Sequence, residues 1–248
     1  MLKLQKKPLA VSLIGAPLYL LLHFDGLIAV PADISAGSML ALRSFGQLPM
    51  SDWNSLTDII GGIAFIILFN ILYSGYITSH FRFSCVYVFS RVRSRESWYL
   101  QRCAEVLFYA ALYSFLYVAA GLLICRHMVV QTITAADMLT ALRIWIYSII
   151  LLGNTTLLLS LISLKTGTLT GFVVTQVAVF LLIFANLFIS APTVIGLNPV
   201  SLLQFKLLTQ TQHIGTVTVN GVILAVLLMA GGQYVKRYDV AMFDAEVN

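Results

Sequence analysis

Long uninterrupted blocks of apolar residues are the feature that most constrains how this chain can fold. Blocks of about 20 apolar residues match the roughly 30 Å hydrocarbon core that a membrane-spanning helix must cross. In lipid, only helices and closed barrels satisfy every backbone polar group, and these blocks lack the period-two alternation of barrel strands. The sequence therefore predicts an all-α integral membrane protein. We place six spans at about residues 8–30, 59–77, 104–125, 144–164, 168–189 and 217–234.

Charged residues are scarce, which argues against a soluble protein. They make up 10% of the 248 residues, against roughly 25% in a typical soluble domain, and 59% of the residues are hydrophobic. The bases behind the net charge of +5 sit at the ends of the apolar blocks. Bases in that position anchor a membrane protein, so the charge does not indicate nucleic-acid binding.

The Lys and Arg residues divide unequally between alternate loops, and this predicts the orientation of the chain. One side holds eleven bases: Lys3, Lys6, Lys7, Arg82, Arg91, Arg93, Arg95, Arg102, Lys165, Lys236 and Arg237. The other side holds four: Arg43, Arg126, Arg143 and Lys206. Because cytoplasmic loops carry the excess of bases, we expect both termini in the cytoplasm.

The predicted loops differ greatly in length. Little more than residues 165–167 joins spans four and five, which predicts a tight antiparallel hairpin, and the Gly167–Gly171 GxxxG pattern beside it favours close helix packing. On the outside, residues 39–45 and 200–208 are apolar enough for short re-entrant or interfacial helices. We find no repeat and no soluble domain, so residues 1–248 are expected to form a single membrane domain.

Residues 82–102, between spans two and three, are the most distinctive part of the chain. One helical stripe in this segment contains residues spaced at i, i+4, i+7 and i+11, which are Arg91, Arg95, Trp98 and Arg102. Ser94 suits a helix N-cap, and Glu96 then lies in the first turn, where the helix dipole favours an acid. These residues predict an amphipathic surface helix that breaks near Ser94, followed by a helix leading into span three. The alternative is an ordinary basic loop that binds anionic headgroups.

A pattern in this segment resembles a known family. Ser-Arg-x-x-Ser-Arg-x-x-Trp, at Ser90 to Trp98, is similar to the coupling loop of the permease subunits of type-2 ATP-binding-cassette exporters. More narrowly, the chain resembles the small bacterial permeases that are encoded beside separate ATPases. Those permeases are associated with export of, or immunity to, peptide antibiotics and bacteriocins. It extends to the six spans, the cytoplasmic termini and the Asn-Pro element at Asn198 and Pro199. This chain departs from the family in lacking a sizeable extracellular domain after its first span.

The resemblance implies a function and partners. The chain would be a multi-pass protein of the bacterial cell membrane, exporting a peptide, a lipid or an amphiphilic drug. It would pair with a second permease copy or a paralogous permease within the membrane lipids. ATPase subunits would dock on the coupling residues, which are Arg91, Arg93, Ser94, Arg95, Glu96, Trp98 and Arg102. The chain has no GxxxxGK[ST] sequence, so ATP and Mg²⁺ would bind in the partner subunit and not here.

Polar residues within the spans are the remaining candidates. Four of them are expected either to line a pathway or to tie helices together: Asn70, Asn154, Gln176 and Asn186. Glu105 lies three residues after Arg102, which predicts either a local ion pair or a hinge contact to the coupling helix.

Enzymatic chemistry finds little support in the sequence. The HExxH pattern is absent, and Ser74 and His80 share one segment without the partner geometry of an intramembrane protease. The three cysteines lack CxxC spacing, so we expect reduced thiols and no metal site. No catalytic residue is therefore predicted. The alternative function is an ATP-independent membrane immunity or toxin-binding protein, whereas a secondary transporter would be expected to show inverted repeats.

Overall fold

The structure, a computed structural model, describes residues 35–45, 53–81, 94–128, 133–188, 198–203 and 214–237. Every regular element in these ranges is helical. In chain order they are α2 (Ala36–Phe45), α3 (Trp53–Tyr73), α5 (Arg95–Met128), α6 (Ala135–Thr166), α7 (Thr168–Phe188), the 3₁₀ helix η1 (Pro199–Leu203) and α10 (Ile214–Arg237). After a turn at Ser74 and Gly75, the chain beyond α3 is helical again as far as Phe81.

Five segments are long and apolar enough to cross a membrane. They are Ile60–Phe81, Arg95–Arg126, Ala135–Thr166, Thr168–Ala185 and Gly215–Arg237. They confirm the all-α prediction and correspond to predicted spans two to six, and the predicted first span at 8–30 lies outside the described residues. The chain is therefore a multi-pass membrane protein. At 34 and 32 residues, α5 and α6 are each about 50 Å long, more than a hydrocarbon core requires.

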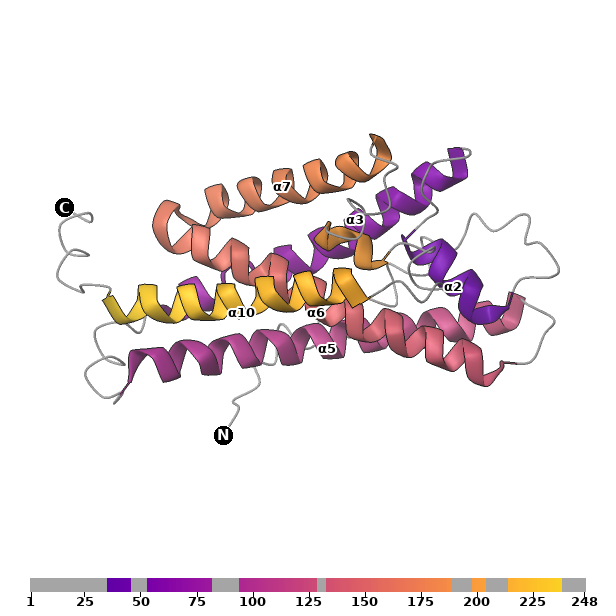
Figure 1. The fold of residues 1–248 in the computed structure, drawn as a ribbon, viewed down its shortest axis with the longest axis horizontal. Coiled ribbons are helices and arrows are strands. Elements are labelled where there is room, and N and C mark those ends of the chain that lie inside the picture. The colour runs from indigo at the N-terminus through magenta and orange to yellow at the C-terminus, as the bar shows by residue number, and fades with distance from the viewer. Residues whose placement is uncertain are drawn as a thin grey trace.

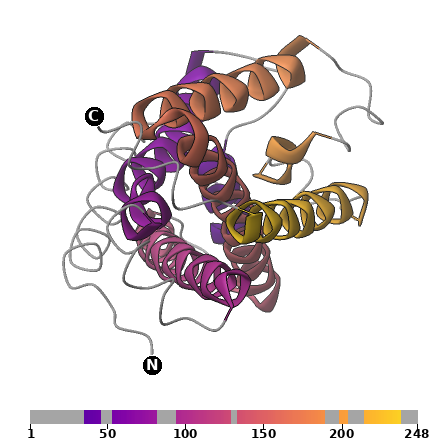
Figure 2. The ribbon, with the colours of Figure 1, turned by 90° about the vertical axis from the view of Figure 1, so that its left-hand side faces the viewer.

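Helix α6 occupies the middle of the bundle. The long helices run in broadly the same direction (Figure 1), with α7 inclined to the others, and the end-on view shows α6 between its neighbours (Figure 2). It contacts every other described element: α2, α3, α5, α7, η1 and α10. In an 18-residue apolar stretch of each helix, 67% of the α6 residues are buried, against 28% in α7 and 22% in α10. The outer faces of α7 and α10 are therefore apolar surfaces suited to lipid or to another membrane protein.

Aromatic side chains hold α3 against α5. The buried rings of this seam are Phe65, Phe69, Tyr73, Tyr109, Tyr113 and Tyr117. Phe65 lies 4.5 Å from Tyr117, centroid to centroid, and Tyr73 stacks on Tyr109 at 5.1 Å. Such pairs add about 1 kcal/mol each beyond the area that they bury, so the seam fixes the register of the two helices.

The turn between α6 and α7 is as tight as the sequence predicts. Gly167, the single residue between the two helices, has φ of +97°, a value that disfavours any residue with a Cβ. At Gly171, one turn into α7, a Cβ would meet the Ser163 backbone nitrogen at 2.8 Å. The GxxxG pattern therefore serves packing between α6 and α7 within one chain.

The two short helices lie where the sequence predicts helical segments. The segment predicted at 39–45 lies within α2, but its Leu40 and Ala41 are fully buried among α3, α5 and α6 instead of lying at an interface. Asp137 fixes this position, because its Oδ1 accepts a 2.9 Å hydrogen bond from the Gly37 backbone while the same side chain completes the α6 capping box with Thr134. The segment predicted at 200–208 begins as η1, and residues 204–208 lie outside the described part.

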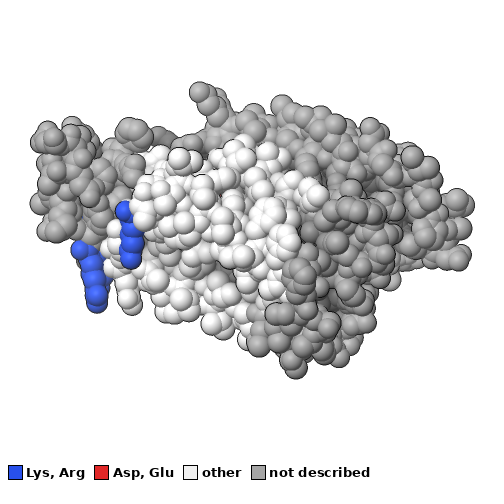
Figure 3. Space-filling model, turned by 90° about the horizontal axis from the view of Figure 1, so that it is seen from above, with Lys and Arg blue, Asp and Glu red and all other residues white. Residues whose placement is uncertain are grey.

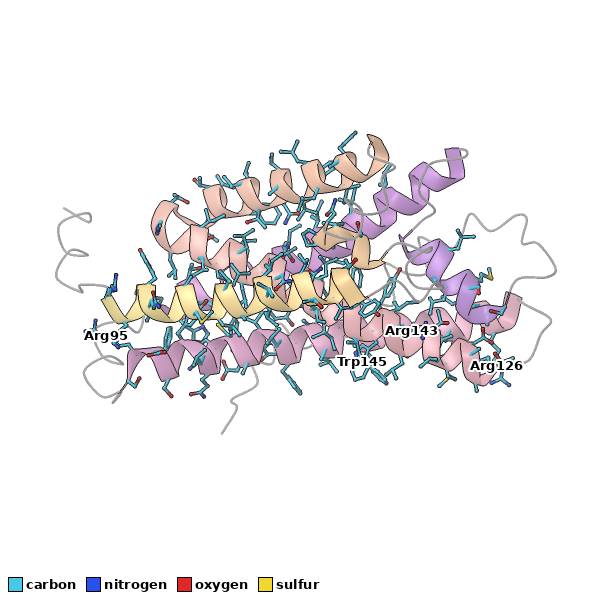
Figure 4. The ribbon with its side chains drawn as sticks, in the orientation of Figure 1. Arg95, Arg126, Arg143 and Trp145 are labelled. Atoms are coloured by element: carbon cyan, nitrogen blue, oxygen red, sulfur yellow. The ribbon has the colours of Figure 1, made fainter. Side chains whose placement is uncertain are left out.

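The described bases of the predicted cytoplasmic side gather at one end of the bundle, here named the basic end: Arg95, Arg102, Lys165, Lys236 and Arg237. The Lys165 ammonium lies 5.5 Å from the Tyr234 ring, which joins the last turns of α6 and α10. In the view of Figure 3, basic side chains lie at one end and the rest of the described surface is uncharged. Figure 4 places Arg95 and Arg126 at opposite ends of α5. Which end faces the cytoplasm stays a prediction.

Candidate functional site

The start of α5 forms the described half of the predicted coupling segment. The helix begins at Arg95, and the Ser97 backbone donates to Ser94 Oγ at 3.3 Å, as the sequence predicts for an N-cap. Glu96 lies in the first turn, beside the positive end of the helix dipole. Ser94 and Glu96 are exposed and Arg95 is half-buried, so these three side chains can reach a partner. Arg91 and Arg93 lie outside the described residues, as does the predicted surface helix before Ser94.

Trp98 and Arg102 of the predicted stripe turn inward. Trp98 is buried, with its ring 6.2 Å from that of Phe81. The Arg102 guanidinium lies 5.8 Å above the same indole, a distance that suits a cation–π contact. Both side chains therefore hold α5 against the helical segment that ends at Phe81.

Glu105 is the central residue of this contact between α5 and the helical segment that ends at Phe81, here named the Glu105 joint. Its Oε2 accepts a 2.6 Å hydrogen bond from Arg102 Nη1 and a 2.7 Å hydrogen bond from Tyr76 Oη. The glutamate side chain is almost completely buried, whereas that of Arg102 is 22% exposed. The predicted Arg102–Glu105 pair is thus confirmed, and Tyr76 is a partner that the sequence does not reveal. The bond to Tyr76 ties the two helices that flank residues 82–93 directly to each other.

The last turns of helix α10 pack against the first turns of α5. A Cβ on Gly231 would overlap the fully buried Tyr99 ring, and one on Gly232 would lie 3.3 Å from Glu96 Cγ. The Tyr99 hydroxyl is 3.5 Å from the Leu227 carbonyl oxygen, a long hydrogen bond. The sequence shows that Gly231 and Gly232 form a small-residue surface on α10. Only the fold shows that α5 packs against this surface.

Asparagines form the polar ties inside the bundle. Asn70 Oδ1 accepts from Thr156 Oγ1 at 2.8 Å, which joins α3 to α6. Asn154 Nδ2 donates to Asn220 Oδ1 at 3.1 Å, and Asn220 Nδ2 donates to the Pro199 carbonyl at 3.1 Å. Asn198 continues the chain of ties by donating to the Leu182 carbonyl at 2.7 Å. The structure therefore assigns Asn70 and Asn154 to interhelical contacts.

Other buried polar atoms have no hydrogen-bond partner among the described residues. They include Asn70 Nδ2, Ser148 Oγ, Asn154 Oδ1, Thr175 Oγ1 and both polar atoms of Gln176. An unpaired buried group costs about 1–3 kcal/mol, so water or a polar group of a ligand would be favoured beside them. Gln176, on α7, is thus the predicted pathway residue with the most unused hydrogen-bonding capacity, whereas the side chain of Asn186 lies outside the described residues.

Comparisons of this chain with protein-family models, curated proteins and solved structures found no match. In the part of the chain that the structure describes, no group of three or more His, Cys, Asp or Glu residues could hold a metal ion. Cys103 and Cys125 are both buried.

Proposed function

We propose that this chain is the transmembrane subunit of an ATP-binding-cassette exporter that moves a peptide, a lipid or an amphiphilic drug. ATP would be hydrolysed by a separate subunit that docks on residues 82–102, and both termini would face that subunit in the cytoplasm of a bacterial cell. The family resemblance of Ser90 to Trp98 is the starting point for this proposal.

The observation that best supports it is the construction of α5. This single helix of 34 residues begins within the segment proposed to dock, and it extends for about 50 Å. Its first turns are held to the α3 side through Tyr76 and Glu105 and to α10 through Tyr99 and Gly231. A force applied beside Ser94 would move these elements together instead of bending one of them.

The exposed faces of α7 and α10 suit a second permease copy or a paralogous permease. Leu169 and Leu181 on α7 are 78% and 65% exposed, and Met229 on α10 is 61% exposed. In this arrangement a pathway along the seam between two permeases would have Gln176 near one of its walls. Lipid covers whatever part of these faces the second permease leaves open.

Co-purification tests the docking assignment. The tagged chain is purified in mild detergent from its own cells, beside a variant carrying Arg91→Glu, Arg93→Glu and Arg95→Glu. We expect an ATPase subunit in stoichiometric amount with the parent chain and its loss from the variant, because the three bases would no longer attract acids on the partner. The control carries Arg126→Glu and Arg143→Glu at the opposite end of the bundle and should retain the ATPase.

Two results would overturn the proposal. Retention of the ATPase by the variant with three glutamates would remove the docking site from these arginines. A parent chain that purifies alone, with no ATP hydrolysis in any fraction, would favour the alternative of an ATP-independent immunity or toxin-binding protein.

A further inference from the structure

A groove of about 470 Å³ lies between the second half of α5 and the first half of α6. Its volume falls in the range of roughly 300–1,000 Å³ that small-molecule sites occupy. Four of its lining side chains are each more than 40% exposed, so the groove is open along its outer side: Phe115, Leu123, Met138 and Leu142. All the lining residues are apolar or aromatic, so a hydrocarbon chain suits the groove and a polar ligand does not.

Aromatic rings close the inner end of the groove. Phe115 and Trp145 meet edge to face with centroids 5.9 Å apart. Trp145 Nε1 donates to the Ala111 carbonyl at 2.9 Å, so the single polar atom of this ring is already satisfied by the protein. The ring therefore presents only carbon to a ligand, and the groove has a floor that an ordinary lipid-facing helix surface lacks.

Arg126 stands at the other end of the groove, on the same side of α5. It follows Leu122 by four residues and Leu123 by three, so it continues the stripe that lines the groove. Its side chain is exposed, and among the described residues it makes no ion pair. Arg143 lies two residues from Trp145 along α6, but it follows the lining residue Leu142 directly and so points about 100° away around the helix.

The depth of these residues matches one leaflet of a bilayer. Arg126 lies 24 residues after Arg102, or about 36 Å along the helix, so the two bases stand at opposite headgroup levels. From Arg126 to Phe115 the helix descends about 16 Å, close to half of the roughly 30 Å hydrocarbon core. An acyl chain that follows the groove would therefore bring its headgroup to Arg126.

We propose that the groove holds one acyl chain of an anionic phospholipid whose phosphate pairs with Arg126. The groove is too small for a helix of another protein, which is about 10 Å across with its side chains. A zwitterionic lipid would fit the hydrocarbon part, but the positive charge of Arg126 favours a headgroup with net negative charge. The inference depends on the membrane placement of α5 and α6 and not on the proposed function.

Quenching of Trp145 fluorescence by brominated lipids tests this site. The full chain is reconstituted in phosphatidylcholine vesicles that contain increasing fractions of dibromo-phosphatidylglycerol or dibromo-phosphatidylcholine. The contribution of Trp145 is the difference between the parent and a Trp145→Phe variant. We expect the anionic lipid to quench Trp145 at an about fivefold lower fraction than the zwitterionic lipid, as one base beside a phosphate would produce.

Three variants identify the cause of any preference. Arg126→Gln should reduce the preference for the anionic lipid to about one, because it removes the charge and leaves the groove intact. Arg143→Gln removes a nearby base of α6 that points away from the groove, and it should retain the preference. Ala119→Phe fills the groove and should reduce Trp145 quenching by both lipids.

Equal quenching by the two lipids in the parent would overturn the proposal, as would a preference that survives Arg126→Gln. Equal losses in the Arg126 and Arg143 variants would show a general attraction to the charged surface instead of a site. Absence of Trp145 quenching by either lipid, together with a dimeric chain in the vesicle, would show that a second copy covers the groove.

Discussion

At its beginning α5 is locked by polar and close-packed contacts, whereas towards its end one side of the same helix is left open as an apolar groove. The first turns hold the buried Glu105, its bonds to Arg102 and Tyr76, and the Tyr99 ring under Gly231. Near the other end, the side facing α6 presents only hydrocarbon. One helix thus combines a directional joint, suited to transmitting movement, with a surface suited to an exchangeable hydrocarbon ligand.

The two ends of α5 differ in how much free energy is lost when a contact is removed. A buried carboxylate deprived of its donors is strongly disfavoured, so the joint at Glu105 has one preferred geometry. Dispersion contacts in a groove are individually weak and non-directional, and lipid tails can replace one another there. Substitutions in the two halves of α5 should therefore have unequal effects on the free energy of unfolding, measured by titrating mixed micelles with sodium dodecyl sulfate.

The largest effect should come from Glu105→Ala, with a loss of about 3 kcal/mol, because Arg102 and Tyr76 would both lose their acceptor. Tyr76→Phe keeps the ion pair and should cost about 1.5 kcal/mol. If the Glu105 variant lost no more stability than the Tyr76 variant, the carboxylate would not be the centre of the joint.

A matched pair of alanines tests the comparison directly. Ala110 is fully buried in the first half of α5, and Ala119 lines the groove. Ala110→Leu should cost about 2 kcal/mol because the added carbons have no room, whereas Ala119→Leu should change the free energy of unfolding by less than about 0.5 kcal/mol. Equal costs at the two positions would mean that the halves of the helix are packed alike.

The contact between α5 and α10 should produce a smaller effect. Gly231→Ala places a Cβ against the Tyr99 ring and should destabilise the protein by about 1 kcal/mol after the gain in helix propensity is counted. Gly221→Ala is the control on the same helix, because a Cβ there meets nothing within 4 Å and should be neutral or stabilising. A stabilising Gly231→Ala would show that α10 does not press on α5.

The smallest effect should belong to the groove floor. Trp145→Phe removes the hydrogen bond to the Ala111 carbonyl but keeps an aromatic ring, so we expect a loss of less than about 1 kcal/mol. A loss as large as that of Glu105→Ala would contradict the view that this end of α5 depends on weak apolar contacts.

Local signals in the sequence located most of the described helices. Apolar length predicted the five described spans, Ser94 and Glu96 predicted the start of α5, and Gly167 predicted the turn into α7. Each of these signals acts over a few residues, or through the transfer of one helix into lipid. The same reasoning could not show that Trp98 faces inward. Nor could it show that Asn70 and Asn154 bond to neighbouring helices while Gln176 has no hydrogen-bond partner among the described residues.

The sequence by itself determined that this chain forms apolar helices, which stretches of the chain could cross a membrane, and that its bases collect on one side. It did not determine every helix end, since α6 begins nine residues before the predicted span at 144–164. Only the tertiary structure decided that Tyr76 completes the Glu105 joint, that Gly231 receives Tyr99, and that Arg126 stands above a groove. The reason is that a membrane helix is apolar on all its faces, so its sequence carries little information about which neighbour each face will meet. Those partners depend on shape and hydrogen bonding between segments far apart in the chain, which exist only once the helices have packed.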